Sequence, residues 1–409
     1  MDDINEIKIN DKPSVTQKMS TANKIGYGIT AACFLLVIFG FAVAGILSPD
    51  REFSDMENRK LSQTPEFSFE NLKSGDFTAD IETYMSDQLF MKDAMVSLKT
   101  GMDRLMLKSY QNGVYFAEDG YYLQDYQENS ALVDKNTAAL NDFTETVKDS
   151  AEVSFLLAPN AISVLSDKLP EVTQADDQLD SIDRIKNSLS EDINFYSAYD
   201  DLKAADDGGT QVFYKTDHHW TAEGAKTAFD GLMNAMGETI PEVKYSVETL
   251  GGFYGTLYSK APDFTAESDE VRLCTNPDNE ITVNYAGDGG DNPELAKAGN
   301  LTRTGLFDES FKDAKDKYKT FLGGNFDLVE IETQGESDEN VLIVKDSYAN
   351  SVMPYFCDKY KHISMIDLRY YHMEELSVSE YVKEKGITKV IFLYNVDFIN
   401  SDNNFMWLD

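Results

Sequence analysis

The sequence predicts a mixed α/β domain with a parallel sheet, preceded by one membrane-spanning helix. Near the C-terminus, apolar strand candidates at residues 340–344, 362–368 and 388–394 alternate with helix candidates, one after Ser347 and one at residues 377–385. Strands that alternate with helices form parallel sheets, and ligands bind at the carboxyl ends of such strands. The second observation is a long apolar stretch near the N-terminus.

This stretch, residues 25–49, contains no charged residue, and its core at residues 31–47 is almost wholly apolar. It is long enough to cross a bilayer as one helix. A cleavable signal peptide is the alternative, but the apolar run is too long and lacks a convincing small-residue cleavage site before Ser48. We therefore expect a cytoplasmic tail at residues 1–24 and an uncleaved anchor at residues 25–48.

Charge says little about orientation, because Lys12, Lys18 and Lys24 lie before the anchor and are matched by Arg51, Arg59 and Lys60 after it. The overall charge excludes one class of partner. The chain has 72 acidic against 36 basic residues and a net charge of −36. Such a surface repels phosphate backbones, so no nucleic-acid partner is expected.

Behind the anchor, we expect a stalk and juxtamembrane helices over residues 49–110, because helical periodicity appears at residues 77–106. Residues 111–409 then form one large domain. Mixed turn and strand signals at residues 237–338 suggest an insertion within it. The first predicted elements of the domain are a helix at residues 132–147 and a strand at residues 153–157.

Cysteine is sparse, so the fold does not depend on a disulfide framework. Cys33 lies within the anchor, and the sequence leaves a disulfide between Cys274 and Cys357 open.

The most informative motif is Asp-His-His-Trp at residues 217–220, which holds two of the four histidines. In an extended segment, Asp217 and His219 point the same way and His218 points elsewhere. Asp217 could then hold one nitrogen of His219 while the other faces a nucleophile. The preceding residues 210–215 are rich in β-formers, and residues 221–236 have helical spacing. The alternative is a pair of structural histidines.

Ser347 is the best-placed nucleophile. A buried strand turns there into a helix, which exposes the hydroxyl and places the backbone N–H where it can stabilise an oxyanion. The alternative is that Ser347 only caps the helix. Because the Asp217–His219 pair needs a nucleophile, we predict a catalytic triad of Ser347, His219 and Asp217.

Metal chemistry is not expected. Asp217, His218 and His219 could ligate an ion, but no third histidine stands at ligand spacing and no His-Glu-x-x-His helix is present. The acidic residues 288–292 lack the spaced oxygen ligands and closing glutamate of a calcium loop. We expect neither a metal nor another cofactor.

Several short motifs resemble the DHHW protein family of Gram-positive bacteria; they lie at residues 57–59, 112–115, 119–121, 216–220 and 345–349. That family is similar to the SGNH-like domains of bacterial alginate O-acetylation proteins. The resemblance extends from about Ser54 to the C-terminus and implies a flavodoxin-like, three-layer, SGNH-hydrolase-like fold. Because the Asp-His motif precedes the serine, the fold would be permuted. In the alginate proteins, these motifs supply the acid, base and nucleophile, roles that fall here on Asp217, His219 and Ser347.

Four further residues are candidates for the site. Asn395 is the nearest counterpart of the asparagine that donates to the oxyanion, although a turn-forming role is the alternative. Tyr348 is a further candidate for oxyanion or substrate binding. Trp220 would pack in the core or against a sugar ring, and Arg369 would bind an anionic polymer or pair with an acid. Lys345 departs from the family pattern, which has glycine there.

The resemblance implies a membrane-anchored O-acetyltransferase or acetylesterase that acts outside the cell on a surface polysaccharide. By analogy, an integral membrane acyltransferase is the expected protein partner. The alternative is a non-catalytic protein that binds surface glycan or organises an envelope complex. The sequence leaves open the glycan, the acyl group, and whether water or a sugar accepts it.

Overall fold

The computed structural model describes residues 21–287, 289–292, 295, 301–372 and 376–409. Residues 1–20 of the expected tail, and Asp288 of the acidic loop, lie outside the described residues. The chain divides into two compact units. The first comprises the residues up to Ser54 together with Lys60–Lys92, and the second comprises Asp55–Arg59 and Asp93–Asp409.

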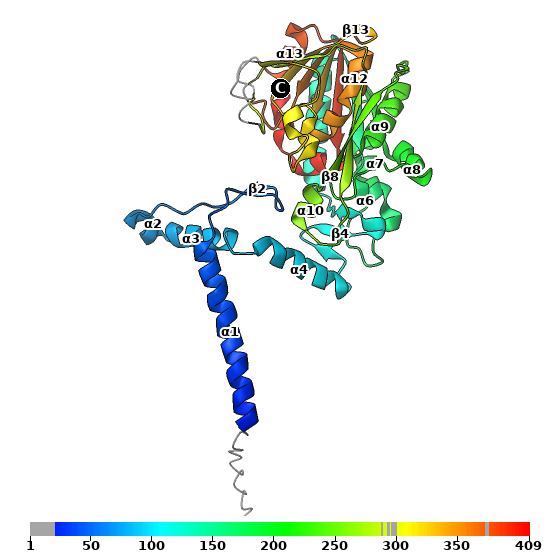
Figure 1. Cartoon of the computed structure of the whole chain (residues 1–409). Helices are drawn as coiled ribbons and strands as arrows, with labels where there is room; N and C mark the ends of the chain where they lie inside the picture. Colours follow the sequence, from blue (N-terminus) through cyan, green and yellow to red (C-terminus); the bar gives the residue numbers. More distant parts are fainter. Residues whose placement is uncertain (1–20, 288, 293–294, 296–300, 373–375) are drawn as a thin grey trace, which may run out of the picture. The chain divides into compact units, whose positions relative to one another are not determined.

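The first unit contains helix α1 (Thr21–Leu47), which Figure 1 draws in blue. Its mean hydropathy reaches 2.6, and it buries none of its residues. Its 27 residues span about 40 Å, more than the hydrocarbon thickness of a bilayer. The helix is therefore long and apolar enough to cross a membrane. Short elements follow it: β1 (Phe53–Ser54), β2 (Arg59–Lys60), α2 (Phe69–Ser74) and α3 (Asp76–Asp87).

The second unit is built on an eight-stranded sheet with the order β11-β10-β12-β14-β13-β15-β6-β7. Figure 1 labels strand β13 of this sheet. Its strands are β6 (Glu152–Ala158), β7 (Ile193–Ser197), β10 (Thr282–Tyr285), β11 (Leu301–Thr304), β12 (Leu328–Glu332), β13 (Ser337–Lys345), β14 (Tyr360–Ile366) and β15 (Lys389–Asn395). From β14 to β7 the neighbouring strands are parallel, whereas β11, β10 and β12 pair antiparallel. The predicted parallel sheet and its four predicted strands are confirmed.

Helices pack on this sheet in two groups around an apolar core. One group contains α5 (Ser130–Val147), α7 (Gln178–Ser188), α13 (Val378–Glu384) and α14 (Val396–Ser401); the other contains α8 (Tyr199–Asp207), α9 (Ala222–Ala235) and α12 (Met353–Lys359). The remaining elements are α4 (Lys92–Leu105), β3 (Tyr110–Gln111), β4 (Val114–Phe116), β5 (Tyr122–Gln124), α6 (Ala161–Val164), β8 (Ser246–Phe253), α10 (Thr256–Lys260), β9 (Asp269–Thr275), and the 3₁₀ turns η1 (Glu118–Gly120), η2 (Ser166–Lys168), η3 (Glu309–Phe311), η4 (Lys317–Thr320), η5 (Ser347–Ser351) and η6 (Asn404–Trp407).

The parallel register brings the candidate site residues to one edge of the sheet. Lys345 at the end of β13 pairs with Leu393 of β15, and Asn395 pairs with Ala158 at the end of β6. The loops that follow these strands therefore begin side by side, as expected for a ligand site on parallel strands.

Two expectations need correction or completion. The β-rich residues 210–215 do not form a strand; they make only an isolated bridge between Phe213 and Trp220. Their apolar side chains are buried because they close a loop, and burial rather than pairing explains the β-like composition. The sulfur atoms of Cys274 and Cys357, whose pairing the sequence left open, are both free.

Candidate active site

The Asp-His-His-Trp motif lies in a tight loop that closes at the bridge between Phe213 and Trp220. After the loop, Thr221 caps α9 by accepting a hydrogen bond from the Gly224 N–H, as its position before the apolar helix predicts. Within the loop, the His219 backbone N–H donates to Asp217 Oδ1 at 3.0 Å. The Asp217 side chain thus bends the backbone in the manner of an Asx turn.

This bend makes the expected orientation of His218 wrong. In an extended segment its ring would point away from His219, but the two ring centroids lie 3.8 Å apart. The side-chain alternation of a strand does not apply, because residues 215–219 form a bend.

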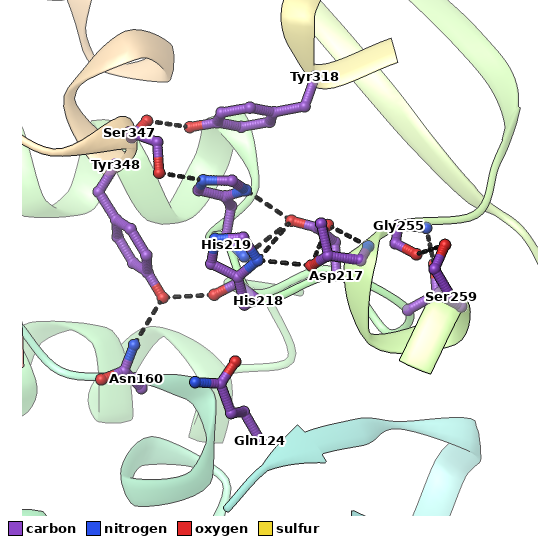
Figure 2. A network of polar contacts seen from close by, with 12 residues as sticks. Gln124, Asn160, Asp217, His218, His219, Gly255, Ser259, Tyr318, Ser347 and Tyr348 are labelled. Atoms are coloured by element: carbon purple, nitrogen blue, oxygen red, sulfur yellow. Dashed lines mark hydrogen bonds and ion pairs between the residues drawn. The ribbon is translucent and has the colours of Figure 1, made fainter. Parts of the chain in front are cut away.

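Ser347, His219 and Asp217 form a continuous chain of hydrogen bonds (Figure 2). His219 Nε2 lies 2.8 Å from Ser347 Oγ, and His219 Nδ1 lies 2.6 Å from Asp217 Oδ1. Asp217 and His219 are buried, whereas Ser347 is partly exposed. The residues predicted as nucleophile, base and acid therefore meet in the arrangement that proton transfer requires.

Asp217 is held as an acceptor on both oxygens. Besides the two bonds from His219, its Oδ2 accepts the Thr256 N–H at 2.7 Å and the Thr256 hydroxyl at 3.0 Å. Burial alone would raise the pKa of Asp217, but neighbouring His218 and His219 and the hydrogen bonds of His219 and Thr256 hold that pKa below its usual range. The carboxylate is therefore ionised and fixes His219 with a proton on Nδ1.

The approach of Thr256 to Asp217 depends on Gly255. A Cβ atom on Gly255 would lie 2.2 Å from the Asp217 Cβ. The backbone of Gly255 also donates to Thr216 Oγ1 at 3.1 Å. Thr216 is fixed in turn by buried Asp269, which accepts its N–H and its hydroxyl. The hydrogen bonds of Gly255 and Asp269 to Thr216 thus position the loop that carries Asp217.

Tyr318 contacts and positions His219 and Ser347, the other two residues of the hydrogen-bonded chain. Its ring stacks on His219 with centroids 3.7 Å apart and planes 7° apart. Its hydroxyl donates to the Ser347 carbonyl at 2.9 Å. One side chain therefore contacts both the candidate base and the backbone of the candidate nucleophile, as Figure 2 shows.

Ser347 begins the turn η5, but it is not the cap. Asp346 occupies the cap position and accepts the Tyr348 N–H at 2.8 Å. Burial raises the pKa of Asp346 to about 6, against the hydrogen bonds that it accepts from Asn395 and Tyr348. The helix cap is therefore Asp346, and Ser347 does not have the capping role that was the alternative to a nucleophile.

Asn395 supports Asp346 and caps α14. Its backbone and side-chain nitrogens each donate to Asp346 Oδ2 at 2.7 Å. Its Oδ1 accepts hydrogen bonds from the Phe398 N–H and from Asn160 Nδ2. These contacts match the turn-forming alternative and join the ends of β13, β15 and β6.

Tyr348 and Trp220 are both fully buried beneath the site. Tyr348 donates its hydroxyl to the His218 carbonyl and accepts from Asn160 at 3.1 Å. The Trp220 Nε1 donates to the Tyr348 carbonyl at 3.1 Å and to Ser351 Oγ at 2.9 Å. Of the two roles considered for Trp220, the structure therefore shows core packing. Tyr348 supports the loop through its hydrogen bond to the His218 carbonyl.

Arg369 pairs with an acid, one of the two alternatives that the sequence left open. Its Nε and terminal nitrogen contact the two oxygens of fully buried Asp367 at 2.8 Å and 2.5 Å. Lys345 lies 3.4 Å from Asp367 and donates to Asn325 and Asn350. The lysine that departs from the family pattern is therefore buried in a compensated ion pair.

Asp217, His218 and His219 place ligand-type atoms within 4.8 Å of one another. However, both ring nitrogens of His219 are hydrogen-bonded to Asp217 and Ser347, and Nδ1 of His218 lies 2.6 Å from Thr256 Oγ1. The arrangement of donors and acceptors favours proton transfer over ion binding.

Sequence reasoning missed Thr256, Tyr318 and Asn160. Asn160 stands just after the predicted strand at residues 153–157, and its place at a strand end could have revealed it. Thr256 and Tyr318 lie among turns in the segment at residues 237–338, where no local pattern singles them out.

The fold and site together define a mixed α/β domain with a Ser-His-Asp constellation at the carboxyl edge of its sheet. The model of the DHHW protein family matches residues 107–366, so the chain belongs to the DHHW family. This confirms the predicted family.

Solved structures show the same fold. A DHHW family protein from Eubacterium siraeum is 26% identical, with a TM-score of 0.60 over 72% of this chain and 94% of that chain. Bacillus cereus PatB1, solved with a sulfonyl adduct, is 21% identical, with a TM-score of 0.59 over 72% of this chain and 98% of that chain. The coarse fold class, mixed α/β with a central sheet, is thus shared with both.

In sequence, the chain is 24% identical over 183 residues to the probable alginate O-acetylase AlgJ of Pseudomonas fluorescens. The match covers 41% of this chain and 44% of AlgJ, less than half the length of that relative.

Proposed function

We propose that this protein is a membrane-anchored serine O-acetyltransferase or acetylesterase that acts on a cell-surface polysaccharide. The observation that carries the proposal is the hydrogen-bonded chain from Ser347 through His219 to Asp217, with distances of 2.8 and 2.6 Å. The similarity to a probable alginate O-acetylase supports polysaccharide O-acetylation as the general activity.

In the proposed mechanism, Asp217 Oδ1 accepts the Nδ1–H of His219, which leaves Nε2 free to act as a base. His219 removes the Ser347 proton as Oγ attacks the carbonyl carbon of an acyl ester. The same proton then passes to the departing alcohol, and an acyl-enzyme remains on Ser347. A sugar hydroxyl or water reverses these steps: it gives its proton to His219 and takes the acyl group, while Ser347 regains the proton.

The Ser347 N–H supports stabilisation of the oxyanion, because it is the first N–H of η5 and has no acceptor within that turn. The side chains of Asn395 and Tyr348 do not take this task. Both are bound to protein groups, and we propose that they position the loop and strand ends. Arg369 retains 28% exposure of its side chain, and we propose that its outer face contributes to binding an anionic polymer.

The anchor supports a location at the cell membrane. We propose that residues 25–48 span the bilayer, that residues 1–24 are cytoplasmic, and that residues 49–110 carry the catalytic domain of residues 111–409 outside the cell. An integral membrane acyltransferase would supply the acyl group. The order of Asp217 and His219 before Ser347, at one sheet edge, supports a permuted SGNH-like arrangement.

A non-catalytic glycan-binding protein is the alternative function. Two features support it: Lys345, which departs from the family pattern, and Asn395, whose side chain donates to Asp346. The buried pair with Asp367, however, accommodates Lys345 without disturbing the hydrogen bond between Ser347 and His219. The observed geometry therefore favours the enzyme.

The test is to trap the acyl-enzyme. Full-length protein in detergent micelles is mixed with 4-nitrophenyl acetate, quenched in acid and digested for mass spectrometry. We expect one acetyl group on Ser347 and none in the Ser347→Ala variant. Acetylation at another residue only, or none in folded protein, would contradict the proposal.

A further inference from the structure

The mechanism above leaves His218 without a task. Its ring lies against one face of His219, with centroids 3.8 Å apart, while Tyr318 stacks on the other face (Figure 2). Because His219 Nε2 bonds to Ser347, the His218 ring lies only one ring away from the nucleophile.

The hydrogen bonds of the Thr256 hydroxyl determine which nitrogen of His218 carries the proton. The Thr256 hydroxyl has one proton and lies between ionised Asp217 Oδ2 at 3.0 Å and His218 Nδ1 at 2.6 Å. A carboxylate can only accept, so the Thr256 proton points to Asp217. The hydroxyl oxygen must then accept a proton from His218, which places hydrogen on Nδ1.

The second nitrogen of His218 is therefore an acceptor when the ring is neutral. Burial lowers the pKa of His218, and the neighbouring His219 adds to that effect, so neutrality is favoured. The side chain nevertheless keeps 29% exposure. Within the part of the chain that the structure describes, no protein donor bonds to His218 Nε2.

We propose that His218 Nε2 accepts a hydrogen bond from a second hydroxyl of the acyl acceptor, so that the enzyme transfers to vicinal diols of a saccharide. This inference rests on the proposed function. One hydroxyl of the diol approaches the acyl carbonyl beside His219 Nε2. The second hydroxyl of the diol, about one hydrogen-bond length away from the first, reaches the ring of His218. Water has no second hydroxyl and gains nothing from His218.

The transfer step balances without any co-reactant. The attacking hydroxyl gives its proton to His219 Nε2 as its oxygen bonds to the acyl carbon. The bond between that carbon and Ser347 Oγ breaks, and His219 returns the proton to Oγ. The second hydroxyl keeps its proton and only donates a hydrogen bond to His218.

Two substitutions separate this role from a structural one. The amide of His218→Asn replaces Nδ1 and can keep the Thr256 bond, but it offers no acceptor at the Nε2 position. The longer His218→Gln places its amide oxygen near Nε2 and gives up the Thr256 bond. The proposal therefore predicts a defect in the asparagine variant and rescue in the glutamine variant.

The experiment uses full-length protein in micelles, 4-nitrophenyl acetate as donor, and methyl β-glucopyranoside as acceptor, with ethanol as the acceptor that lacks a second hydroxyl. Mass spectrometry gives the ratio of acetylated glucoside to free acetate. We expect this ratio to fall about tenfold in His218→Asn, the worth of one hydrogen bond. In His218→Gln it should stay near the wild-type value, and the ethanol ratio should be the same in all three proteins.

A larger loss in His218→Gln than in His218→Asn would show that the Thr256 bond matters instead, and would overturn the inference. Equal glucoside ratios in all three proteins would overturn it as well, while acetylated Ser347 in the wild type would leave the proposed function standing. Absence of acetyl-Ser347 in the wild type would overturn both.

Discussion

Gly255 should not tolerate even an alanine, because the backbone there passes against the side chain of Asp217. The methyl group added by Gly255→Ala would lie 2.2 Å from Cβ and 2.3 Å from Oδ2 of Asp217. Carbon atoms pack at about 3.5 Å, so Asp217 or the start of α10 must move by more than about 1 Å. Neither can move freely, since Asp217 is buried and bonded on both oxygens.

Such a shift breaks the 2.7 and 3.0 Å bonds from Thr256 to Asp217 and turns His219 away from Ser347. A misplacement of about 1 Å costs on the order of 100-fold in rate. Overpacking should also lower the free energy of unfolding by about 1–3 kcal/mol. Hydrolysis of 4-nitrophenyl acetate gives the first quantity, and urea unfolding gives the second.

Gly251→Ala is the matched control, because a Cβ atom there meets nothing within 4 Å and the residue lies in the neighbouring strand β8. It should match the wild type in both measurements. If Gly255→Ala did so too, the close approach of α10 to Asp217 would be irrelevant to the site and our account of how it is positioned would fail.

The other predictions concern the triad, its supports and the topology. Ser347→Ala, His219→Ala and Asp217→Asn should each abolish most esterase activity in folded protein, and a triple variant that loses much more than the worst single one would argue against a shared unit. Because the pKa of Asp217 is lowered in the folded protein, the ionised side chain stabilises the fold fully above about pH 4, and this stabilisation is lost as the pH falls further. The difference in the free energy of unfolding between wild type and Asp217→Asn, measured with urea, should therefore become smaller from pH 7 to about pH 3. A constant difference would refute this. Tyr318→Phe should lower kcat less than Tyr318→Leu, which loses the stack on His219 as well as the hydroxyl, and the opposite order would count against positioning by stacking. Protease added to wall-stripped cells should digest the chain after Ser48 and spare a tag at the N-terminus; protection of the domain would reverse the proposed topology.

The parts of the fold that sequence reasoning predicted are those with strong local signals. Helix α9 combines the capping Thr221 with apolar residues at helical spacing. Strands β6, β13 and β15 are short buried runs, and burial of both sheet faces makes such runs apolar throughout. Strands β10, β11 and β12 pair antiparallel and lie among turn signals, and this mixed pattern is what suggested an insertion over residues 237–338.

The candidate site likewise divides into residues that local sequence signals predicted and residues that they did not. Asp217 and His219 are neighbours in sequence and Ser347 follows a clear strand, so their pairing could be predicted. Thr256 and Tyr318 reach the site through contacts across long sequence separations, which composition does not encode. The orientation of His218 failed for a different reason: the Asp217 side chain bonds the backbone of the loop and replaces the extended geometry on which alternation depends.

The residues that hold Asp217 and stack on His219 come from the segment between the two motifs, at Thr256 and Tyr318. A relative can therefore carry an intact Asp-His-His-Trp motif and an intact serine and still be inert, if its intervening segment has drifted. Under the proposed function, the two motifs alone therefore describe only part of the site, and a glycine-threonine pair aligned with Gly255 and an aromatic residue aligned with Tyr318 describe the rest.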